Sequence, residues 1–215
     1  ANEMPESDRE HWQQKERYVA LQADLSSASD VEVLVANISA LNLTIDAVIH
    51  NASYFVADDP LASLQEHWKL QQEMMAVHVM SVDAITMGLI PRYAKSASIV
   101  AITDIYVDKP NQRFASYCAA KSALQNLCLS YSQRLAPNIR VNIIQPGPIQ
   151  FLTQHSEDYR EKVLSQSLLK RELGYGAILQ AAEYLQLAQG VTGAILKVDG
   201  GRANANHYEQ SFSVN

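Results

Sequence analysis

The chain has 215 residues, of which 47% are hydrophobic and 19% are charged, and its formal net charge is −6. This composition suits one globular domain with a sizeable core, and the negative charge argues against nucleic acid or an anionic membrane as a partner. No apolar run approaches the roughly 18 residues of a transmembrane helix, and the polar residues 1–17 do not resemble a signal peptide. We therefore expect a cytoplasmic protein.

Short apolar runs alternate with segments of helical periodicity along the chain. Strands are predicted at residues 18–23, 46–50, 98–103, 139–145 and 194–198. Helices are predicted from Ser29 or Asp30 to 41, and at 61–66, 69–90, 114–136, 157–170 and 175–188. Apolar strands in such an alternation are typical of a parallel sheet with helices on both faces. The pattern predicts a single α/β domain.

Small or polar residues follow four of the predicted strands. They are Asp24, Asn51-Ala52-Ser53, Thr103-Asp104 and Pro146-Gly147. Ligands of open α/β sheets bind beyond the carboxyl ends of the strands, so these residues are expected to share one crevice. Turn residues also gather at strand ends, and the pattern alone does not separate a site from ordinary turns.

Tyr117 and Lys121 lie four residues apart in the predicted helix 114–136, and therefore share one helical face. A lysine ammonium one turn away favours the phenolate, so we predict that the pKa of Tyr117 is below its usual value of about 10. A phenol tuned in this way can give or take a proton near neutral pH. The same spacing also arises by chance on solvated helices.

Cysteine and metal chemistry is not indicated. Cys118 and Cys128 lie on the same predicted helix, ~15 Å apart at about 1.5 Å per residue, which is too far for a disulfide. We expect both to be reduced packing residues. No cluster of His, Cys and carboxylate residues has the spacing of metal ligands, so no metal is predicted.

Taken together, these residues resemble the short-chain dehydrogenase/reductase family. The resemblance covers nearly the whole chain and includes Thr192-Gly193 and Asp199-Gly200-Gly201 near its end. It implies a Rossmann-like doubly wound parallel sheet, a nicotinamide cofactor, Tyr117 as acid/base, and Lys121 as the residue that binds the nicotinamide ribose. The cofactor contacts it implies are Asp24 and Leu25 at the adenine, Asn51, Ala52 and Ser53 along the cofactor, Pro146 and Gly147 at the nicotinamide, and Tyr117 and Lys121.

Three departures from the common family pattern narrow the resemblance. Asp104 stands where the family usually has a catalytic Ser, and the turn Asn51-Ala52-Ser53 replaces Asn-Ala-Gly and is followed by an aromatic pair that includes Phe55. These two features resemble the pteridine reductase branch. His78 replaces an Asn of the long helix and, with His50, resembles the bacterial dihydromonapterin reductases. The resemblance implies that NADPH is the cofactor and that a dihydropterin is the substrate, with dihydrofolate as a weaker substrate.

The chemistry of these departures suits a pterin. The Asp104 carboxylate can accept from pterin N–H groups or relay a proton, whereas Ser suits a ketone oxygen. Phe55 either stacks the flat pterin against the nicotinamide or belongs to the core. His78 is either a hydrogen-bonded core residue or a proton relay. We predict Asp104, Tyr117 and Lys121 as catalytic residues, and Ser53, Phe55, Asp104 and Tyr117 as substrate-binding residues.

Two other functions fit the same sequence. One is a general carbonyl or alcohol dehydrogenase, and the other is a non-catalytic nucleotide-binding regulatory protein. The second gains weight because the family begins with a Gly-rich turn that holds the cofactor pyrophosphate, whereas all eight glycines here lie at or after Gly88. We expect that the N-terminal βαβ unit of the family is missing, so that the strands 18–23 and 46–50 lack the partner that would link them.

The resemblance also implies an assembly and a substrate loop. A homotetramer is expected, and the apolar residues Leu124, Leu127, Cys128 and Leu135 serve either the core or that interface. The segment from Pro148 to about Glu172 corresponds to the mobile substrate loop of the family.

Overall fold

The computed structural model describes residues 18–205. Its centre is a four-stranded sheet in the order β1-β2-β3-β4. The strands are β1 (Ile45–His50), β2 (Tyr93–Ile102), β3 (Ile139–Pro146) and β4 (Ile195–Val198). All three pairings are parallel. The predicted single α/β domain with a parallel sheet is confirmed.

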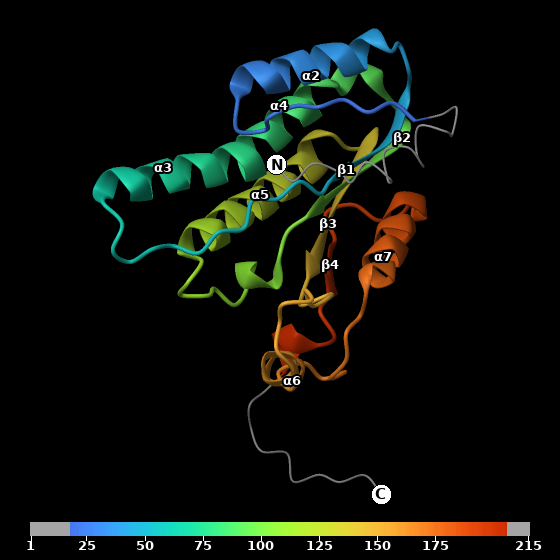
Figure 1. Ribbon diagram of the computed structural model, residues 1–215. Helices are drawn as coiled ribbons and strands as arrows, with labels where there is room; N and C mark the ends of the chain where they lie inside the picture. The colour runs from blue at the N-terminus through green and yellow to red at the C-terminus, as the bar shows by residue number, and fades with distance from the viewer. Residues whose placement is uncertain (1–17, 206–215) are drawn as a thin grey trace, which may run out of the picture.

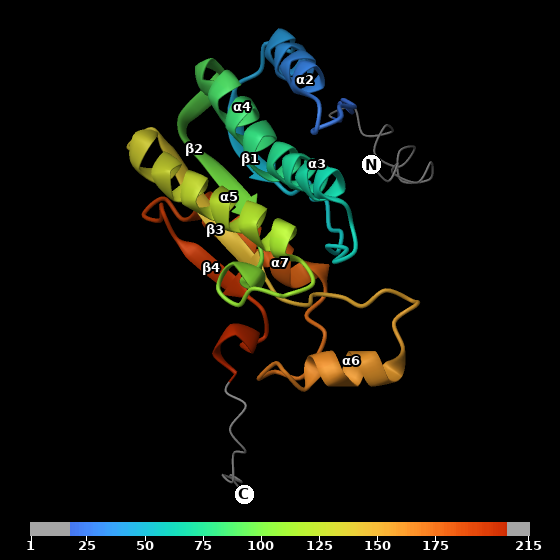
Figure 2. The same ribbon diagram turned by 90° about the vertical axis from the view of Figure 1, so that its left-hand side faces the viewer.

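Helices lie on both faces of the sheet (Figure 1). One face carries α2 (Ala28–Ala40), α3 (Leu64–Met75), α4 (Ser81–Gly88) and α5 (Ala115–Arg134), and the other carries α7 (Tyr175–Leu187). Helix α6 (Glu157–Leu164) lies away from the sheet (Figure 2). Within residues 18–205 the structure also has three 3₁₀ turns: η2 (Ile90–Arg92), η3 (Ile105–Val107) and η4 (Arg202–Asn204). None of the helices that the structure describes is long and apolar enough to cross a membrane.

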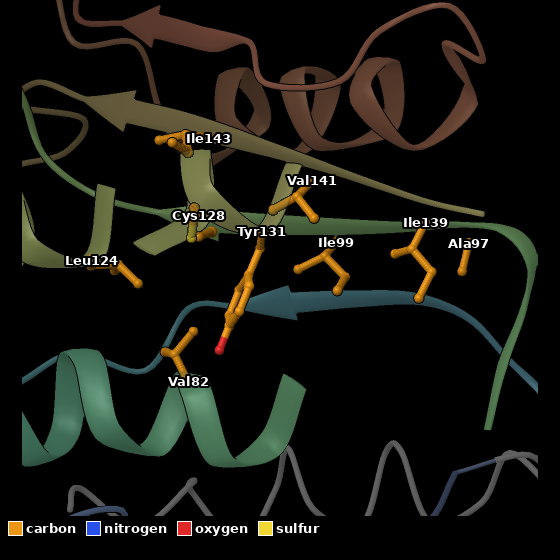
Figure 3. Packing of buried hydrophobic residues seen from close by; sticks show 10 residues of the cluster. Val82, Ala97, Ile99, Leu124, Cys128, Tyr131, Ile139, Val141 and Ile143 are labelled. Atoms are coloured by element: carbon orange, nitrogen blue, oxygen red, sulfur yellow. The ribbon is translucent and has the colours of Figure 1, made fainter. Parts of the chain in front are cut away.

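Alternate residues of the central strands supply the two halves of the core, as the period of a strand requires. Ile99, Val141 and Ile143 pack against Leu124 and Cys128 of α5 (Figure 3). The intervening residues, Val100 and Ile144, pack against Ala181, Ala182 and Leu185 of α7. Leu127 and Leu135 border the first cluster, so all four apolar residues of α5 considered for an interface contribute to the core. Both cysteines are free and buried.

The predicted helices at 61–66 and 69–90 are one continuous helix. Ser63 and Glu66 form a capping box at its start, with Ser63 N donating to Glu66 Oε2 at 2.7 Å. α3 then continues through a π-helical segment, Ala76–Met80, into α4. The predicted break is therefore wrong, because the true start signal lies at Ser63.

Two other predicted elements differ from the structure. The helix predicted at 157–170 ends at Leu164, because Leu169 N donates to Gly200 O at 3.0 Å and ties the following residues to a distant turn. Residues 18–23 form no strand. A strand needs a partner for its backbone groups, and β1 pairs only with β2 in the part of the chain that the structure describes. Helix α2 begins earlier than predicted, with Ser27 as its N-cap.

Candidate active site

Asp104 and Tyr117 are in direct contact. β2 delivers Asp104 just past its carboxyl end, and the first turn of α5 delivers Tyr117. Tyr117 Oη donates a hydrogen bond to Asp104 Oδ2 at 3.0 Å. The other carboxylate oxygen, Oδ1, accepts from Tyr106 N at 2.8 Å and fixes the start of η3. The structure thus brings together two of the predicted catalytic residues in a place where Tyr117 is only 5% exposed.

This contact reverses the predicted effect on the phenol. Burial, followed by the negative charge of Asp104, raises the pKa of Tyr117 above its ordinary value. Burial also raises the pKa of Asp104, although the hydrogen bonds from Tyr106 and Tyr117 oppose that shift. The predicted lowering of the Tyr117 pKa is wrong for this structure. Carboxyl and phenol instead form a pair in which both groups hold a proton more tightly than in water.

The ammonium of Lys121 bonds to the end of β2 and lies close to the ring of Tyr117. Its Nζ donates to Ile102 O at 2.9 Å and lies 5.6 Å from the centroid of the Tyr117 ring. The side chain is 2% exposed, and burial lowers its pKa to about 8. Ile102 O is the one hydrogen-bond acceptor of this ammonium among residues 18–205. An ammonium has three donors, so Lys121 keeps donors for the hydroxyl groups of a ligand.

His78 holds the turn that follows β1. Its Nδ1 donates to Met74 O at 3.0 Å, and its Nε2 accepts from Tyr54 N at 3.2 Å and lies 3.1 Å from Ser53 Oγ. Burial lowers the pKa of His78 to about 4, so the ring is neutral at physiological pH. Of the two roles considered for this residue, the structure favours the hydrogen-bonded core histidine, which positions Ser53 beside the site.

Phe55 covers the phenol and is not part of the core. Its ring stacks on Phe114 with 4.3 Å between centroids and an angle of 18° between planes. It meets Tyr117 edge to face at 4.7 Å. Because Phe55 is 52% exposed, it has aromatic surface available to a flat ligand next to the Asp104–Tyr117 pair.

A hollow of about 450 Å³ lies beside the turn 51–53. Predicted cofactor residues line it, namely Asp24, Leu25, Ala52 and Ser53. The Asp24 carboxylate accepts from Ser26 N at 2.9 Å and from Ser26 Oγ at 2.7 Å, and these bonds lower its pKa. Asn51 is exposed at the end of β1 and does not line this hollow.

The chain is similar in sequence to known reductases. A family model described as Enoyl-(Acyl carrier protein) reductase matches residues 2–203. The dihydromonapterin reductase of Klebsiella pneumoniae is 33% identical over 188 residues, which span 86% of this chain and 77% of that protein. The dihydromonapterin reductase of Escherichia coli is 31% identical over 186 residues, spanning 85% and 76% of the two chains.

The chain belongs to the short-chain dehydrogenase/reductase family. Among solved structures, FolM alternative dihydrofolate reductase 1 from Brucella canis, complexed with NADP, superposes with a TM-score of 0.78 at 28% identity, over 90% of this chain and 76% of that one. The protein of the same name from Brucella suis, also in complex with NADP, gives 0.74 at 30% identity, over 86% and 74%. This short-chain reductase is therefore an oxidoreductase with the Rossmann-like fold that the resemblance implied.

Gly147 of the reductase is required by packing. Its N–H donates to Val198 O at 3.0 Å, and a Cβ added there would lie 2.8 Å from Asp199 Cβ. Only glycine therefore allows the chain after Pro146 to pass this close to the end of β4. The predicted contact of Pro146 and Gly147 with the nicotinamide stays a prediction.

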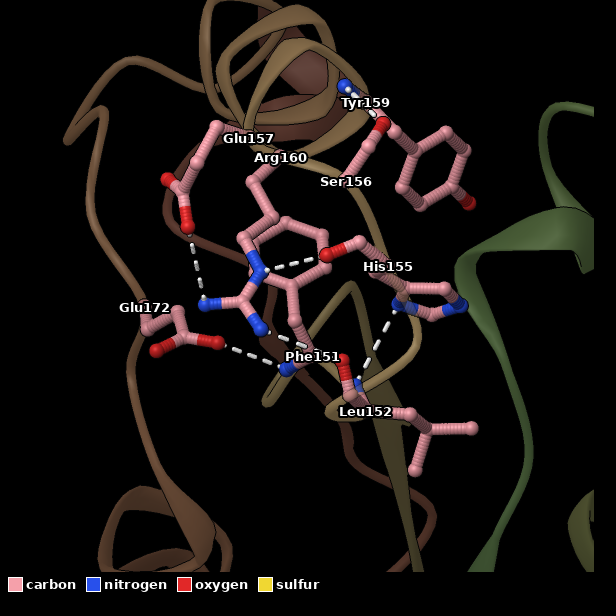
Figure 4. Close-up of polar contacts among 8 residues, drawn as sticks. All are labelled: Phe151, Leu152, His155, Ser156, Glu157, Tyr159, Arg160 and Glu172. Carbon is pink, nitrogen blue, oxygen red and sulfur yellow. Dashed lines mark hydrogen bonds and ion pairs between the residues drawn. The ribbon is translucent and has the colours of Figure 1, made fainter.

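The segment 148–172, predicted as the substrate loop, has a defined internal structure (Figure 4). Arg160 of α6 donates from Nε to His155 O and from its terminal nitrogen to Leu152 O, both at 3.1 Å. Glu172 accepts from Phe151 N at 2.6 Å and closes the segment at its base. The side chain of Arg160 therefore organises the first part of this segment, and its role as a substrate loop stays a prediction.

Sequence reasoning missed Asp58 in the reductase. Its carboxylate accepts from both the hydroxyl and the backbone N–H of Ser116, and Asp58 N donates to Arg113 O at 2.9 Å. Helix α5 has no cap from its own N-cap residue, Phe114, so Asp58 supplies it from a distant loop. No local signal marks this role, because its partner lies 58 residues away.

The structure shows no cluster of three or more His, Cys, Asp or Glu residues suited to a metal within the described range 18–205.

Proposed function

We propose that the protein is an NADPH-dependent reductase that converts a dihydropterin, of the dihydromonapterin type, to its tetrahydro form. The observation that carries the proposal is the contact of Asp104 with Tyr117, since Asp104 stands where ketone-reducing members of the family have a serine. The names of the relatives support the same substrate class.

The residues present fit a nicotinamide cofactor. The buried Lys121 ammonium has spare donors for ribose hydroxyls, and the hollow beside Asp24 and Leu25 has room for the adenosine end. When bound, the reduced cofactor supplies a hydride. The NADP in the two Brucella structures supports NADPH over NADH.

The side chains divide the remaining work between binding and proton transfer. Phe55 offers a flat aromatic surface that positions the pterin ring. Burial raises the pKa of Asp104. Its carboxyl group either carries a proton or accepts a hydrogen bond from an N–H of the pterin, and Tyr117 donates a hydrogen bond to Asp104. The proton that follows the hydride then comes from this pair, directly or through a water molecule.

The first test is a turnover panel with NADPH and NADH. The substrates are dihydromonapterin, dihydrobiopterin, dihydrofolate and simple ketones, with oxidation of the cofactor followed by absorbance. We expect turnover of dihydropterins with NADPH. Turnover of ketones alone would replace the proposal by a carbonyl reductase, and failure of NADPH to bind in calorimetry would point to a non-catalytic nucleotide-binding protein.

The second test exchanges the residue that carries the proposal. We expect Asp104→Ser to reduce dihydropterin turnover about 100-fold, and to leave ketone turnover unchanged or improved. Asp108→Ser is the matched control, because Asp108 lies in the same segment but is exposed and pairs with Lys197 at 2.7 Å. Equal losses in both variants would contradict the role of Asp104.

We further propose a cytoplasmic homotetramer. This rests on family membership, since assembly through helices is common among short-chain reductases. Sedimentation equilibrium of the purified protein tests the oligomeric state.

A further inference from the structure

A polar pocket of about 320 Å³ opens directly beyond the active site. It begins at the residues after Asp104 and is closed by the end of the substrate segment and by η4, which approach one another in Figure 1. Its polar lining residues are Tyr106, Lys109, Asn111, Gln112, Gln166 and Arg202. It shares no lining residue with the hollow beside Asp24, so it lies apart from the predicted cofactor residues there.

Two cations in this pocket have only neutral partners. Lys109 Nζ donates to Arg202 O at 3.1 Å. The guanidinium of Arg202 donates to Val163 O at 2.8 Å and to Gln166 Oε1 at 2.5 Å. Within residues 18–205, neither cation forms an ion pair with a carboxylate. The neighbouring carboxylate of Asp108 is engaged by Lys197. The charge of Arg202 also acts on the Asp104 carboxylate. Two positive charges that line one pocket without a direct ion pair still favour an anion there.

Aromatic rings connect this pocket to the pterin position. Phe55 stacks on Phe114, and Phe114 lies 6.4 Å from the ring of Tyr106 with an angle of 19° between planes. Asn111 donates to Tyr106 Oη at 3.1 Å and holds that ring at the pocket wall. If a pterin lies beside Phe55, an aryl group attached to it can therefore pack along these aromatic rings and extend toward the two cations.

We propose that this pocket is a carboxylate subsite, and that it binds the acidic end of an aryl-linked substituent on the pterin, as in dihydrofolate. The proposal rests on the proposed dihydropterin reductase activity, and it assigns the residues that would bind the acidic tail of a substrate in the same site. Lys109 and Arg202 supply the charge, and the amides of Asn111, Gln112 and Gln166 supply polar contacts around it. Dihydromonapterin, whose side chain has no carboxylate, does not use the subsite.

The test compares substrates with and without the acidic tail. In Lys109→Gln the side chain loses its charge but keeps an N–H donor for Arg202 O. We expect KM for dihydrofolate to rise about fivefold, which corresponds to one partly exposed ion pair, with KM for dihydromonapterin unchanged. Lys109→Arg should restore the dihydrofolate value. The matched control is Lys95→Gln, because Lys95 is exposed near the start of β2, at the other end of the strand.

A probe that lacks the pterin ring tests binding at the subsite independently of the reaction. 4-Aminobenzoyl-glutamate should inhibit dihydromonapterin reduction by the unaltered protein and not by Lys109→Gln, and its diester should inhibit neither. Inhibition should weaken as salt is raised. If dihydromonapterin is reduced but Lys109→Gln behaves like Lys95→Gln with dihydrofolate and the probe, the subsite is overturned and the proposed function stands. If no dihydropterin is reduced, the proposed function fails and the subsite fails with it.

Discussion

The two walls of the active site differ in burial and in bonding. The inner wall, formed by residues 103–105 and by Tyr117 and Lys121, is almost closed to solvent: Thr103 is 2% and Ile105 3% exposed. What we call the outer wall, residues 51–63 together with the predicted substrate segment 148–172, leaves large apolar side chains in water, with Phe55 at 52% and Leu168 at 57% exposed. Under the proposed function, proton chemistry takes place where burial shifts pKa values, and substrate selection falls to the more exposed wall.

The largest expected difference between the walls concerns the phenols. We expect Tyr117→Phe to reduce kcat for dihydropterins about 1,000-fold because the proton donor to Asp104 is lost. Tyr159→Phe, on the outer wall and 48% exposed, should leave kcat unchanged. Steady-state kinetics under saturating cofactor measure both, and a Tyr117→Phe enzyme with normal kcat would remove the phenol from the mechanism.

The second difference concerns acid stability at the junction of the walls. The pKa of His78 is about 4 in the folded protein and about 6.5 unfolded, so the unfolded chain binds more protons between these pH values. The free energy of unfolding should therefore fall as pH drops from about 6.5 to 4, by on the order of 2–3 kcal/mol for this residue. His50, with a pKa also lowered by burial to about 4, acts in the same direction.

Replacing His78 isolates its contribution to the loss of stability at low pH. His78→Gln keeps a hydrogen-bond acceptor and cannot be protonated, so urea unfolding at a series of pH values should show a smaller loss of stability on acidification. His155→Gln on the outer wall should follow the unaltered protein. The same pH slope in His78→Gln and in the unaltered protein would show that His78 does not carry the acid sensitivity.

The third difference concerns the contact of Asp58, in the outer wall, with the start of α5, which carries Tyr117. Asp58→Asn should cost about 1–2 kcal/mol of stability because α5 loses a charged cap, and it should raise KM for dihydropterins by loosening the loop that carries Phe55. Asp59→Asn is the control, since the Asp59 carboxylate accepts from Leu61 N of the same loop, at 2.9 Å, and caps no helix in the described residues. Urea unfolding and KM measurements on both variants decide whether the cap contributes.

The smallest expected effect lies wholly within the outer wall. Arg160→Gln removes the cation that bonds His155 O and Leu152 O, and should lower global stability by less than about 1 kcal/mol because this segment packs apart from the sheet. Limited proteolysis within residues 151–172 should nevertheless accelerate. The exposed Lys162→Gln serves as control, and equal cleavage of the two variants would contradict the organising role of Arg160.

Residues whose partners are close in sequence or fixed by the sheet were predictable. The placement of Asp104 beside Tyr117 followed from the end of a strand and the first turn of the next helix, and the structure confirms that the two touch. The direction of the shift in the Tyr117 pKa was not predictable, because helical spacing reveals neither the burial of the phenol nor its contact with the Asp104 carboxylate.

Features that depend on distant partners escaped prediction. The early end of α6 depends on the bond from Leu169 to Gly200, and the cap of α5 comes from Asp58. The segment 18–23, predicted as a strand, has suitable apolar residues. A strand forms only when another strand pairs with its backbone, and the residues of the segment itself do not show whether that partner is present.

The π-helical segment Ala76–Met80 sets the rotational phase of the long helix. An i→i+5 turn accommodates one residue more than an α-turn, and one residue corresponds to about 100° of rotation. With this offset, Met74 faces Tyr117 and Cys118 while Val82, further along, faces Ile99 of the sheet. Deleting one residue within the segment would restore a regular α-helix and turn one of these faces toward solvent. The number of residues between Ser63 and Gly88 is therefore as constrained as their chemistry.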